Sequence, residues 1–303
     1  MKKSRDAAHA GQVLAEYGEY VIIACEACGF AHCMPIPDSE KLAGEYAEEY
    51  YSSVKPDYIS KVEADRVWHD LVSAQRLEKL EALTTGKRLL EIGSGPGFLL
   101  NVARKRGWDV LGFEPSGQAW RYSSEVLDLP VRNEFFSEET ARNIGKFDVI
   151  YLALVLEHVP DPLNLMRVVK SCLQPGGAIC VSVPNDFSII QRNYENFLEG
   201  GRRYWLAPPH HINYFSHESL KQTLTACGFT SVYMDSSFPL DFARLMGFDY
   251  TKDAALGSKC HALRMNFEKC LDEYGFSEFL AELYALCAKH GIGREAIIYA
   301  THA

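Results

Sequence analysis

The sequence lacks any uninterrupted run of the roughly 18 apolar residues that a membrane-spanning helix needs. The opening residues, Met1–Asp6, are not followed by an apolar signal region, so a cytoplasmic protein is predicted. Excess positive charge is missing too, because 31 Lys and Arg stand against 40 Asp and Glu, which gives a formal net charge of -9. Phosphate backbones and anionic membranes would on average repel such a chain, so nucleic acid is a poor candidate partner.

Internal repeats and low-complexity tracts are also missing, and 303 residues with 47% hydrophobic content are sufficient for about two packed domains. The sequence also lacks the even number of cysteines typical of a disulfide framework, since it has nine. Only Cys25, Cys28 and Cys33 lie close together in the sequence. The other six are scattered among apolar residues and are predicted to be reduced core thiols: Cys172, Cys180, Cys227, Cys260, Cys270 and Cys287.

From Lys87 onward, short apolar runs alternate with amphipathic segments, as in a parallel sheet flanked by helices. This pattern predicts a doubly wound, Rossmann-like α/β fold with a mostly parallel sheet of seven strands. The predicted strands are residues 88–92, 109–113, 130–132, 147–153, 178–183, 230–235 and 295–300. The predicted helices are residues 97–106, 117–127, 162–173 and 217–227. Pro175–Gly177 is expected to turn the chain from helix to strand.

The remaining segments do not follow this alternation. Residues 1–85 are predicted to form a separate N-terminal section, in which the cysteine cluster precedes an acidic, helical lid over residues 41–85. The main domain is predicted to cover residues 86–303. Within it, residues 184–216, rich in aromatics and His, and residues 237–292, with two plausible helices, are expected as additions over one edge of the sheet.

The strongest chemical signal is a predicted strand that runs into a glycine-rich turn and then a helix. Gly93, Gly95 and Gly97 allow the backbone to bend tightly and to approach a ligand closely. A dinucleotide fingerprint would need glycine where this chain has Phe98, and the acidic Glu91 before the turn would oppose a phosphate. That acid suits a ligand with sulfonium and ammonium groups. Glu114, at the end of the next predicted strand, is a suitable acceptor for ribose hydroxyls.

These motifs resemble those of a known family. Residues 89–100 resemble the first motif of class I S-adenosylmethionine-dependent methyltransferases, residues 112–116 resemble their second, and residues 147–162 are similar to the fourth-strand motif of the branch that includes ubiquinone O-methyltransferases. The resemblance implies that S-adenosylmethionine is the cofactor and S-adenosylhomocysteine the product. A nicotinamide-dependent enzyme, which shares the strand-loop-helix logic, is the alternative.

The resemblance also implies roles for individual residues. The methionine end of the cofactor would be lined by Glu91, Gly93, Gly95, Gly97 and Ala153, the ribose would be held by Glu114, and the adenine would be flanked by the loop at Phe135 and Phe136. Ser94 and Pro115, from the same motifs, complete the implied cofactor-binding set.

Methyl transfer also requires that the acceptor be aligned and that its proton be removed. His158 follows the fourth predicted strand at the ligand-binding edge of the sheet and is the first candidate for a general base. His210 and His211, in the aromatic segment 204–215, are the next, and Asn185 and Asp186 follow the fifth predicted strand. Each has a purely structural alternative, as a cap, a buried loop residue or an Asx turn.

Metal-assisted catalysis is not expected at this edge. The resemblance implies that ubiquinone-type enzymes have a metal site after this strand, built from a glutamate and a Glu-His pair. This chain has the pair, Glu157 and His158, but Leu154 at the position of the glutamate. A leucine side chain has no atom that can coordinate a cation.

The N-terminal cluster resembles one zinc knuckle, with Cys25, Cys28 and His32 as candidate ligands. His32 and Cys33 are adjacent, so in an extended segment they point to opposite faces and cannot both bind one ion. A complete site needs a ligand from elsewhere, such as His9, or an open position. A reduced structural turn is the alternative. The section is similar to the cysteine-rich modules of deoxysugar C-methyltransferases, which carry two such cysteine pairs where this chain has one.

Taken together, these motifs are similar to bacterial enzymes that methylate sugars in polysaccharide or glycoside pathways. The resemblance implies a sugar or nucleotide sugar as the acceptor, at a hydroxyl or a carbon, bound by the additions to the sheet. An O-methyltransferase of a phenolic or quinone acceptor is the alternative among enzymes. A non-catalytic module that binds S-adenosylmethionine for regulation is the alternative outside them.

Overall fold

The computed structural model describes residues 9–38, 58–197 and 203–302. By contacts, the chain divides into two compact units. Unit 1 contains Met1–Ile36, Val183–Thr223 and Tyr233–Ile298, and unit 2 contains Pro37–Ser182, Leu224–Val232 and Tyr299–Ala303. This division by contacts does not coincide with the domain boundary predicted between residues 85 and 86. The division into an N-terminal section and a cofactor-binding domain stays a prediction.

The larger sheet has seven strands in the order β10-β11-β8-β7-β4-β5-β6. Their bounds are β4 Arg88–Ile92, β5 Asp109–Phe113, β6 Val131–Arg132, β7 Phe147–Ala153, β8 Leu173–Pro184, β10 Thr230–Ser236 and β11 Glu295–Thr301. The strands from β4 to β8 pair in parallel. Backbone hydrogen bonds join residue 176 to 302 and residue 185 to 294, so β11 runs antiparallel to β8. The predicted seven-stranded, mostly parallel sheet is confirmed.

The order of the strands creates a switch point between β4 and β7. The chain moves outward through β5 and β6 on one side of β4, and then returns to β7 on the other side. In open α/β folds, ligands bind at the carboxyl ends of the strands beside such a point. Leu89 and Leu90, neighbours on β4 that face opposite sides of the sheet, are both fully buried. The sheet is therefore covered on both faces at this place.

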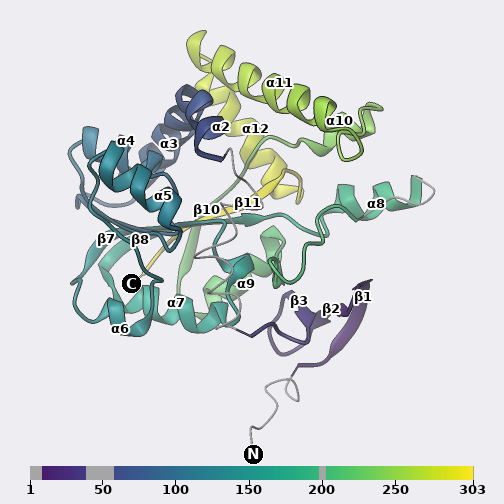
Figure 1. Ribbon diagram of the computed structural model, residues 1–303, viewed down its shortest axis with the longest axis horizontal. Helices are drawn as coiled ribbons and strands as arrows, with labels where there is room; N and C mark the ends of the chain where they lie inside the picture. Colours follow the sequence, from purple (N-terminus) through teal and green to yellow (C-terminus); the bar gives the residue numbers. More distant parts are fainter. Residues whose placement is uncertain (1–8, 39–57, 198–202, 303) are drawn as a thin grey trace, which may run out of the picture. The chain divides into compact units, whose positions relative to one another are not determined.

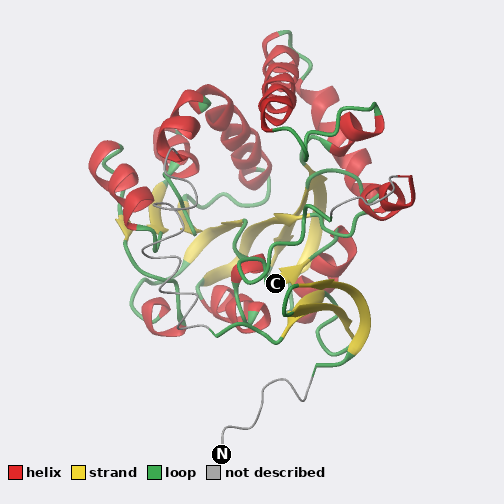
Figure 2. Cartoon of the chain, turned by 45° about the vertical axis from the view of Figure 1, so that its right-hand side comes forward, coloured by secondary structure: helices red, strands yellow, loops and turns green. Residues whose placement is uncertain are grey.

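In unit 2, helices cover both faces of the sheet (Figures 1 and 2). Helices α3, α4 and α5 lie on one face, and α6 and α7 lie on the other (Figure 1). The bounds are α2 Tyr58–Ala64, α3 Arg66–Glu81, α4 Phe98–Lys105, α5 Gly117–Arg121, α6 Glu138–Ala141 and α7 Pro162–Ser171. Within the predicted helical lid, α2 and α3 are confirmed, and Leu77 and Leu80 of α3 are fully buried. The part of the lid before Tyr58 lies outside the described residues.

Two elements differ from the prediction. β8 begins at Leu173, and Pro175–Gly177 lies inside the strand instead of forming the expected turn. The reason is a bulge: Phe147 pairs with Leu173 but Val149 pairs with Ala178, so β8 carries extra residues that the fixed proline ring and the left-handed Gly176 accommodate. The predicted helix over 117–127 is α5 followed by a π-helical turn, Tyr122–Val126.

Unit 1 contains a small sheet of four strands in the order β1-β2-β3-β9. Figure 2 shows its first strands as a curved ribbon near the N-terminus. The bounds are β1 Gly11–Tyr17, β2 Tyr20–Cys25, β3 Ala31–Met34 and β9 Asn213–Tyr214. The helices of the two expected additions and of the segment between them are α8 Ile189–Phe197, α9 His217–Ala226, α10 Asp241–Leu245, α11 Ala254–Glu273 and α12 Ser277–Lys289. The second addition thus holds three helices where two were expected.

No disulfide joins any cysteine among the described residues. Of the six cysteines predicted to be reduced core thiols, Cys270 is exposed on α11 and Cys227 is half-buried, whereas the other four are buried. Among the described residues, no helix has the length and apolar character required to cross a lipid bilayer.

Candidate functional site

The glycine loop between β4 and α4 adopts the conformation for which glycine is needed. Gly93, Gly95 and Gly97 have φ angles of 70°, 52° and 81°, all in the left-handed region. A Cβ atom on Gly97 would meet Leu129 Cδ1 at 2.7 Å, so this glycine is required by packing as well. A Cβ on Gly95 would meet nothing closer than the Tyr58 hydroxyl at 3.9 Å. Gly95 is therefore the glycine beside open space, where a ligand can approach the backbone.

Glu114 ends the neighbouring strand β5 and is tied to this loop. Its Oε2 atom accepts a hydrogen bond from the Gly95 backbone N–H at 2.7 Å, and its Oε1 accepts one from the Ser116 N–H at 2.8 Å. The side chain is only 5% exposed, and this burial raises its pKa to about 7, although both N–H bonds favour the charged form. Each carboxylate oxygen keeps a second lone pair, so a ribose hydroxyl can still donate to it.

Glu91, on β4, brings a second buried acid to the same region. Burial raises its pKa well above the usual value, and repulsion from Glu114 raises it further, while the charge of Arg76 opposes both. Arg76 lies on α3 and donates a hydrogen bond to the hydroxyl of Tyr151, the residue that pairs with Glu91 across β4 and β7. The carboxyl of Glu91 and the guanidinium of Arg76 thus attract each other, and such a pair of opposite charges suits the ammonium and carboxylate ends of an amino acid.

The carboxyl end of β7 carries the first candidate base. Leu154, directly after the strand, has a left-handed φ of 57° and a side chain that is 47% exposed. A short 3-10 turn, Leu156–His158, follows. His158 Nε2 lies 3.7 Å from a carboxylate oxygen of Glu157, whose side chain is 2% exposed against 20% for His158. The imidazole is therefore accessible and has a buried carboxylate beside it.

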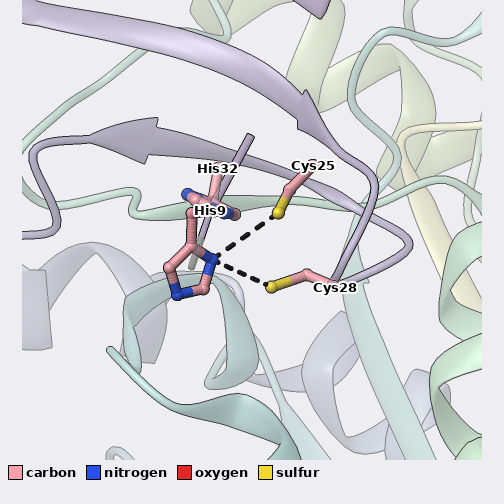
Figure 3. A group of neighbouring side chains, drawn as sticks. All are labelled: His9, Cys25, Cys28 and His32. Atoms are coloured by element: carbon pink, nitrogen blue, oxygen red, sulfur yellow. Dashed lines mark hydrogen bonds between the residues drawn. The ribbon is translucent and has the colours of Figure 1, made fainter. Parts of the chain in front are cut away.

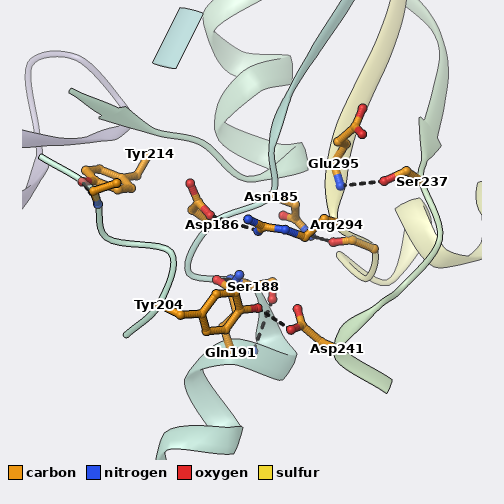
Figure 4. Close-up of polar contacts among 12 residues, drawn as sticks. Asn185, Asp186, Ser188, Gln191, Tyr204, Tyr214, Ser237, Asp241, Arg294 and Glu295 are labelled. Atoms are coloured by element: carbon orange, nitrogen blue, oxygen red, sulfur yellow. Dashed lines mark hydrogen bonds and ion pairs between the residues drawn. The ribbon is translucent and has the colours of Figure 1, made fainter. Parts of the chain in front are cut away.

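In unit 1, Asp186 belongs to a network of charged and phenolic side chains (Figure 4). Asp186 is 2% exposed, and the Arg294 guanidinium points toward it with an N to O separation of 3.6 Å. Burial raises the pKa of Asp186 to about 7, against the attraction of Arg294. Asp241 accepts hydrogen bonds from the hydroxyls of Tyr204 and Tyr250. The network therefore gathers two carboxylates, a guanidinium and two phenols.

The backbone fixes this network from two directions. The Asp186 N–H donates to the carbonyl of Phe215, just after β9, and the Asn185 N–H donates to the carbonyl of Arg294, just before β11. The amide of Asn185 also donates to the carbonyls of Gly291 and Gly293. The Asn185 side chain thus anchors the turn before β11. Its Oδ1 atom accepts no hydrogen bond, so it does not form the Asx turn that was its structural alternative. The Asp186 side chain faces Arg294.

The predicted histidine pair lies in the loop before β9. His210 and His211 are both half-buried, and the His211 N–H donates to the carbonyl of Ala207. The same loop is closed by the Tyr214 hydroxyl, which accepts a bond from the Ala207 N–H. Ser216 caps α9 as expected, since its hydroxyl accepts from the Ser219 N–H.

The structure brings the predicted metal-site residues together with His9 (Figure 3). One potential ligand atom from each of His9, Cys25, Cys28 and His32 lies within 4.8 Å of all the others. Cys33, next to His32, is not part of this group. Its Sγ lies 3.9 Å from the carbonyl of Pro35, and burial raises its pKa to about 12, so it stays a thiol.

Several residues of these sites were not predicted from the sequence. Arg76 and Tyr58 come from the helices before β4, and Arg294, Asp241 and Tyr250 come from segments far along the chain. No local motif marks any of them. The one usable signal was the helical periodicity of residues 66–81, which left Arg76 next to the buried positions of α3.

A family model described as a methyltransferase domain matches residues 63–233, which is more than half of the chain. The chain belongs to this family. Together with the strand order and the glycine loop, the match makes it a class I S-adenosylmethionine-dependent methyltransferase. The family match supports S-adenosylmethionine as the cofactor and counts against a nicotinamide cofactor.

Curated relatives include two ubiquinone biosynthesis O-methyltransferases. The protein from Vibrio parahaemolyticus is 33% identical over 127 residues, which cover 40% of this chain and 51% of the relative. The protein from Actinobacillus pleuropneumoniae is 36% identical over 109 residues, which cover 33% of this chain and 47% of the relative. The methyltransferase thus spans about half the length of the curated relatives it matches.

Solved structures give the same fold at low sequence identity. A SAM-dependent methyltransferase from Archaeoglobus fulgidus has a TM-score of 0.50 and 16% identity, and covers 77% of this chain and 94% of that chain. The plantazolicin methyltransferase in complex with S-adenosylhomocysteine has a TM-score of 0.50 and 14% identity, and covers 86% of this chain and 94% of that chain. At these identities the likeness supports the fold alone.

Proposed function

We propose that this methyltransferase acts on a hydroxyl group of a sugar, glycoside or nucleotide sugar. The observation that carries the proposal is the network of Asp186, Tyr204, Asp241, Tyr250 and Arg294. A sugar presents many hydroxyl groups, and each needs a donor or an acceptor in a fixed position when it leaves water. Carboxylates, phenols and a guanidinium in one cluster supply such partners.

The cofactor end of the proposal rests on unit 2. Bound S-adenosylmethionine supplies an activated methyl group, and its thioether leaves without protonation. Glu114 accepts the ribose hydroxyls beside the Gly95 N–H, and Gly95 lets the cofactor approach the backbone. Glu91 would face the ammonium group and Arg76 the carboxylate, because these two side chains attract each other and Arg76 bonds to Tyr151, the residue paired with Glu91. Ser94, Pro115 and Ala153 line the same edge, and Phe135 and Phe136 flank the adenine.

The acceptor hydroxyl must lose its proton as it becomes a nucleophile. We assign this proton to His158, because its imidazole is accessible and the buried Glu157 carboxylate stands 3.7 Å away to stabilise the positive charge that protonation creates. Asp186 and the pair His210 and His211 are assigned to binding the acceptor hydroxyls. Leu154 stands where a metal-assisted mechanism of the ubiquinone type would need an acidic residue, so the proposed step does not use a metal.

An O-methyltransferase of a phenolic or quinone acceptor is the second candidate. It is supported by the function of the two similar ubiquinone biosynthesis O-methyltransferases, whose similarity covers 40% and 33% of this chain. A quinone with an apolar tail offers few groups for the charged network in unit 1.

The two candidates are separated by one assay. The purified protein is incubated with methyl-labelled S-adenosylmethionine and a panel of nucleotide sugars, glycosides, catechols and quinols, and labelled products are identified by mass spectrometry. Label on a sugar oxygen supports the proposal, whereas label confined to phenolic oxygens supports the second candidate. Asp186→Asn should raise the KM for the sugar and leave cofactor affinity intact.

A further inference from the structure

The cluster of His9, Cys25, Cys28 and His32 beside the small sheet has the composition of a metal site. Two of its four residues are cysteines and two are histidines, and they come from three places: His9 before β1, Cys25 and Cys28 on either side of the end of β2, and His32 on β3 (Figure 3). A tetrahedral set of two thiolates and two imidazoles is characteristic of structural zinc.

The spacing of the atoms agrees with such a site. Zinc bonds of about 2.3 Å to sulfur and about 2.0–2.1 Å to nitrogen, at the tetrahedral angle, hold sulfur and nitrogen about 3.6 Å apart. His9 Nδ1 lies 3.5 Å from Cys25 Sγ and 3.3 Å from Cys28 Sγ. The imidazole rings of His9 and His32 meet edge to face, with centroids 4.8 Å apart.

His32 supplies an independent indication. It is 1% exposed, and its Nδ1–H donates to the carbonyl of Cys33 at 3.1 Å, which leaves Nε2 with a lone pair. Nε2 is buried without a hydrogen-bond partner. A neutral ring whose other nitrogen is fixed by a carbonyl is the usual state of a metal-ligating histidine.

We propose that His9, Cys25, Cys28 and His32 bind one zinc ion, and that this ion fixes β3 against β9 and so supports the acceptor-binding segment. Four protein ligands close the coordination shell, so the ion is structural and takes no part in methyl transfer. Gly29, with φ 76° and its N–H donating to the Cys25 carbonyl, forms the tight turn between the two cysteines and β3. Both thiols lose their protons when the ion binds.

The second half of the proposal follows a continuous path of contacts inside unit 1. His32 pairs with Asn213 across β3 and β9, and the Cys33 N–H donates to the Ile212 carbonyl at 2.8 Å. The Phe30 ring packs on Phe215 with centroids 4.8 Å apart. Phe215 in turn accepts the bond from the Asp186 N–H at 2.8 Å. Because β9 has only two residues, it depends on β3 for its position.

The first experiment measures metal in the full-length protein, purified without chelators and freed of any histidine tag. Inductively coupled plasma mass spectrometry should find about one zinc per chain. Replacement by cobalt should give the absorption of a tetrahedral ion with thiolate ligands. Cys25→Ser and Cys28→Ser should lose the metal, whereas Cys33→Ala and the exposed Cys270→Ser should keep it.

Two results would overturn the site. One is zinc-free wild-type protein that takes up no zinc on titration under reducing conditions. The other is metal content that persists in the Cys25→Ser, Cys28→Ser double variant. Because the wild-type measurement decides by itself, a variant that fails to fold does not remove the test.

The second experiment removes zinc with a chelator and follows backbone amide hydrogen exchange. Exchange at Cys33 and Asp186 should accelerate, while exchange within β4, β5 and β7 and the affinity for S-adenosylmethionine should not change. Unchanged protection at Cys33 and Asp186 would overturn the support of β9. Removal of zinc should also raise the KM for the acceptor, and this expectation rests on the proposed function. The metal content and the exchange rates do not depend on the acceptor, so a wrong acceptor assignment and a wrong zinc assignment are distinguishable.

Discussion

Glu114 accepts a hydrogen bond from the backbone N–H of Gly95 at 2.7 Å, which joins the end of β5 to the glycine loop that follows β4. The residue that the sequence assigns to the ribose therefore also holds the loop in shape. The two strand ends are also joined through the backbone, because the N–H groups of Gly93 and Ser94 donate to the carbonyl of Phe113.

Replacing Glu114 by Ala should weaken S-adenosylmethionine binding by roughly tenfold or more, since charge-assisted bonds of about 1.5–3 kcal/mol are lost. Isothermal titration calorimetry measures this change. Glu139→Ala, at an exposed position on α6, is the matched control and should bind as the wild type does. Wild-type affinity in the Glu114 variant would contradict the ribose assignment.

The same carboxyl predicts a pH dependence. Burial raises the pKa of Glu114 from 4.5 to about 7. Between these values the folded protein holds a proton that the unfolded chain has lost, so the contribution of Glu114 to stability is greatest below 4.5 and declines until pH reaches about 7. Cofactor binding favours the ionised form, so affinity should rise with pH by at most about tenfold per unit and level off above 7.

Calorimetry across this pH range checks the second prediction. Glu114→Gln cannot ionise and should lose the step near pH 7 while it keeps one acceptor oxygen. A wild-type affinity that is flat through neutral pH, or a step that survives in the glutamine variant, would contradict the assignment of this titration to Glu114.

Much of this site could be predicted from the sequence, because its information is local. The apolar runs of β4, β5 and β7 and the spacing of Gly93, Gly95 and Gly97 are visible within a few residues of one another, and strand ends of a parallel sheet share one edge. The strand β8 was misjudged at its start because proline and glycine usually mark a turn, whereas here the antiparallel pairing with β11 keeps those residues in the strand.

The other sites depend on pairings that no local pattern records. Asp186 meets Arg294 because β8 and β11 lie side by side in opposite directions. His9 reaches Cys25, 16 residues away in sequence, because β1 and β2 form a hairpin that brings its two ends together. The strand β9 has two residues and cannot show a two-residue period. Its pairing with β3 was therefore not predictable.

Two glycines of the loop should respond differently to substitution. Both positions have a left-handed φ, so alanine at either costs about 1–2 kcal/mol of stability. Gly97→Ala adds contacts of 2.7 Å with Leu129 and 3.0 Å with Ser123, both buried, for a further loss of about 1–3 kcal/mol. Gly95→Ala adds no such contact.

Thermal unfolding and calorimetry separate these effects. Gly97→Ala should show the larger fall in Tm. Gly95→Ala should show the larger loss of cofactor affinity relative to its fall in Tm, because its methyl group enters the space next to the backbone that the cofactor approaches. If the loss of cofactor affinity in each variant is proportional to its fall in Tm, Gly95 has no part in binding.

The last prediction concerns the group that removes the proton of the acceptor. Loss of a general base typically costs about 10²–10⁴ in rate and leaves binding of the cofactor intact. We expect His158→Ala to lower kcat by this amount, whereas His210→Ala and His211→Ala should mainly raise the acceptor KM. Asp186→Asn should also act on KM. Each variant needs a cofactor titration, so that loss of folding is not mistaken for loss of catalysis.

The pH profile of kcat distinguishes the two side chains that could act as the base, His158 and Asp186. If His158 is the base, the fall of the rate toward acid pH should vanish in His158→Ala and persist in Asp186→Asn. Burial raises the pKa of Asp186 to about 7, so this carboxyl could also accept a proton near neutral pH. The reverse pattern, with the acid limb lost only in Asp186→Asn, would therefore move the base to Asp186. Wild-type kcat in all four variants would mean that the acceptor gives up its proton to none of them.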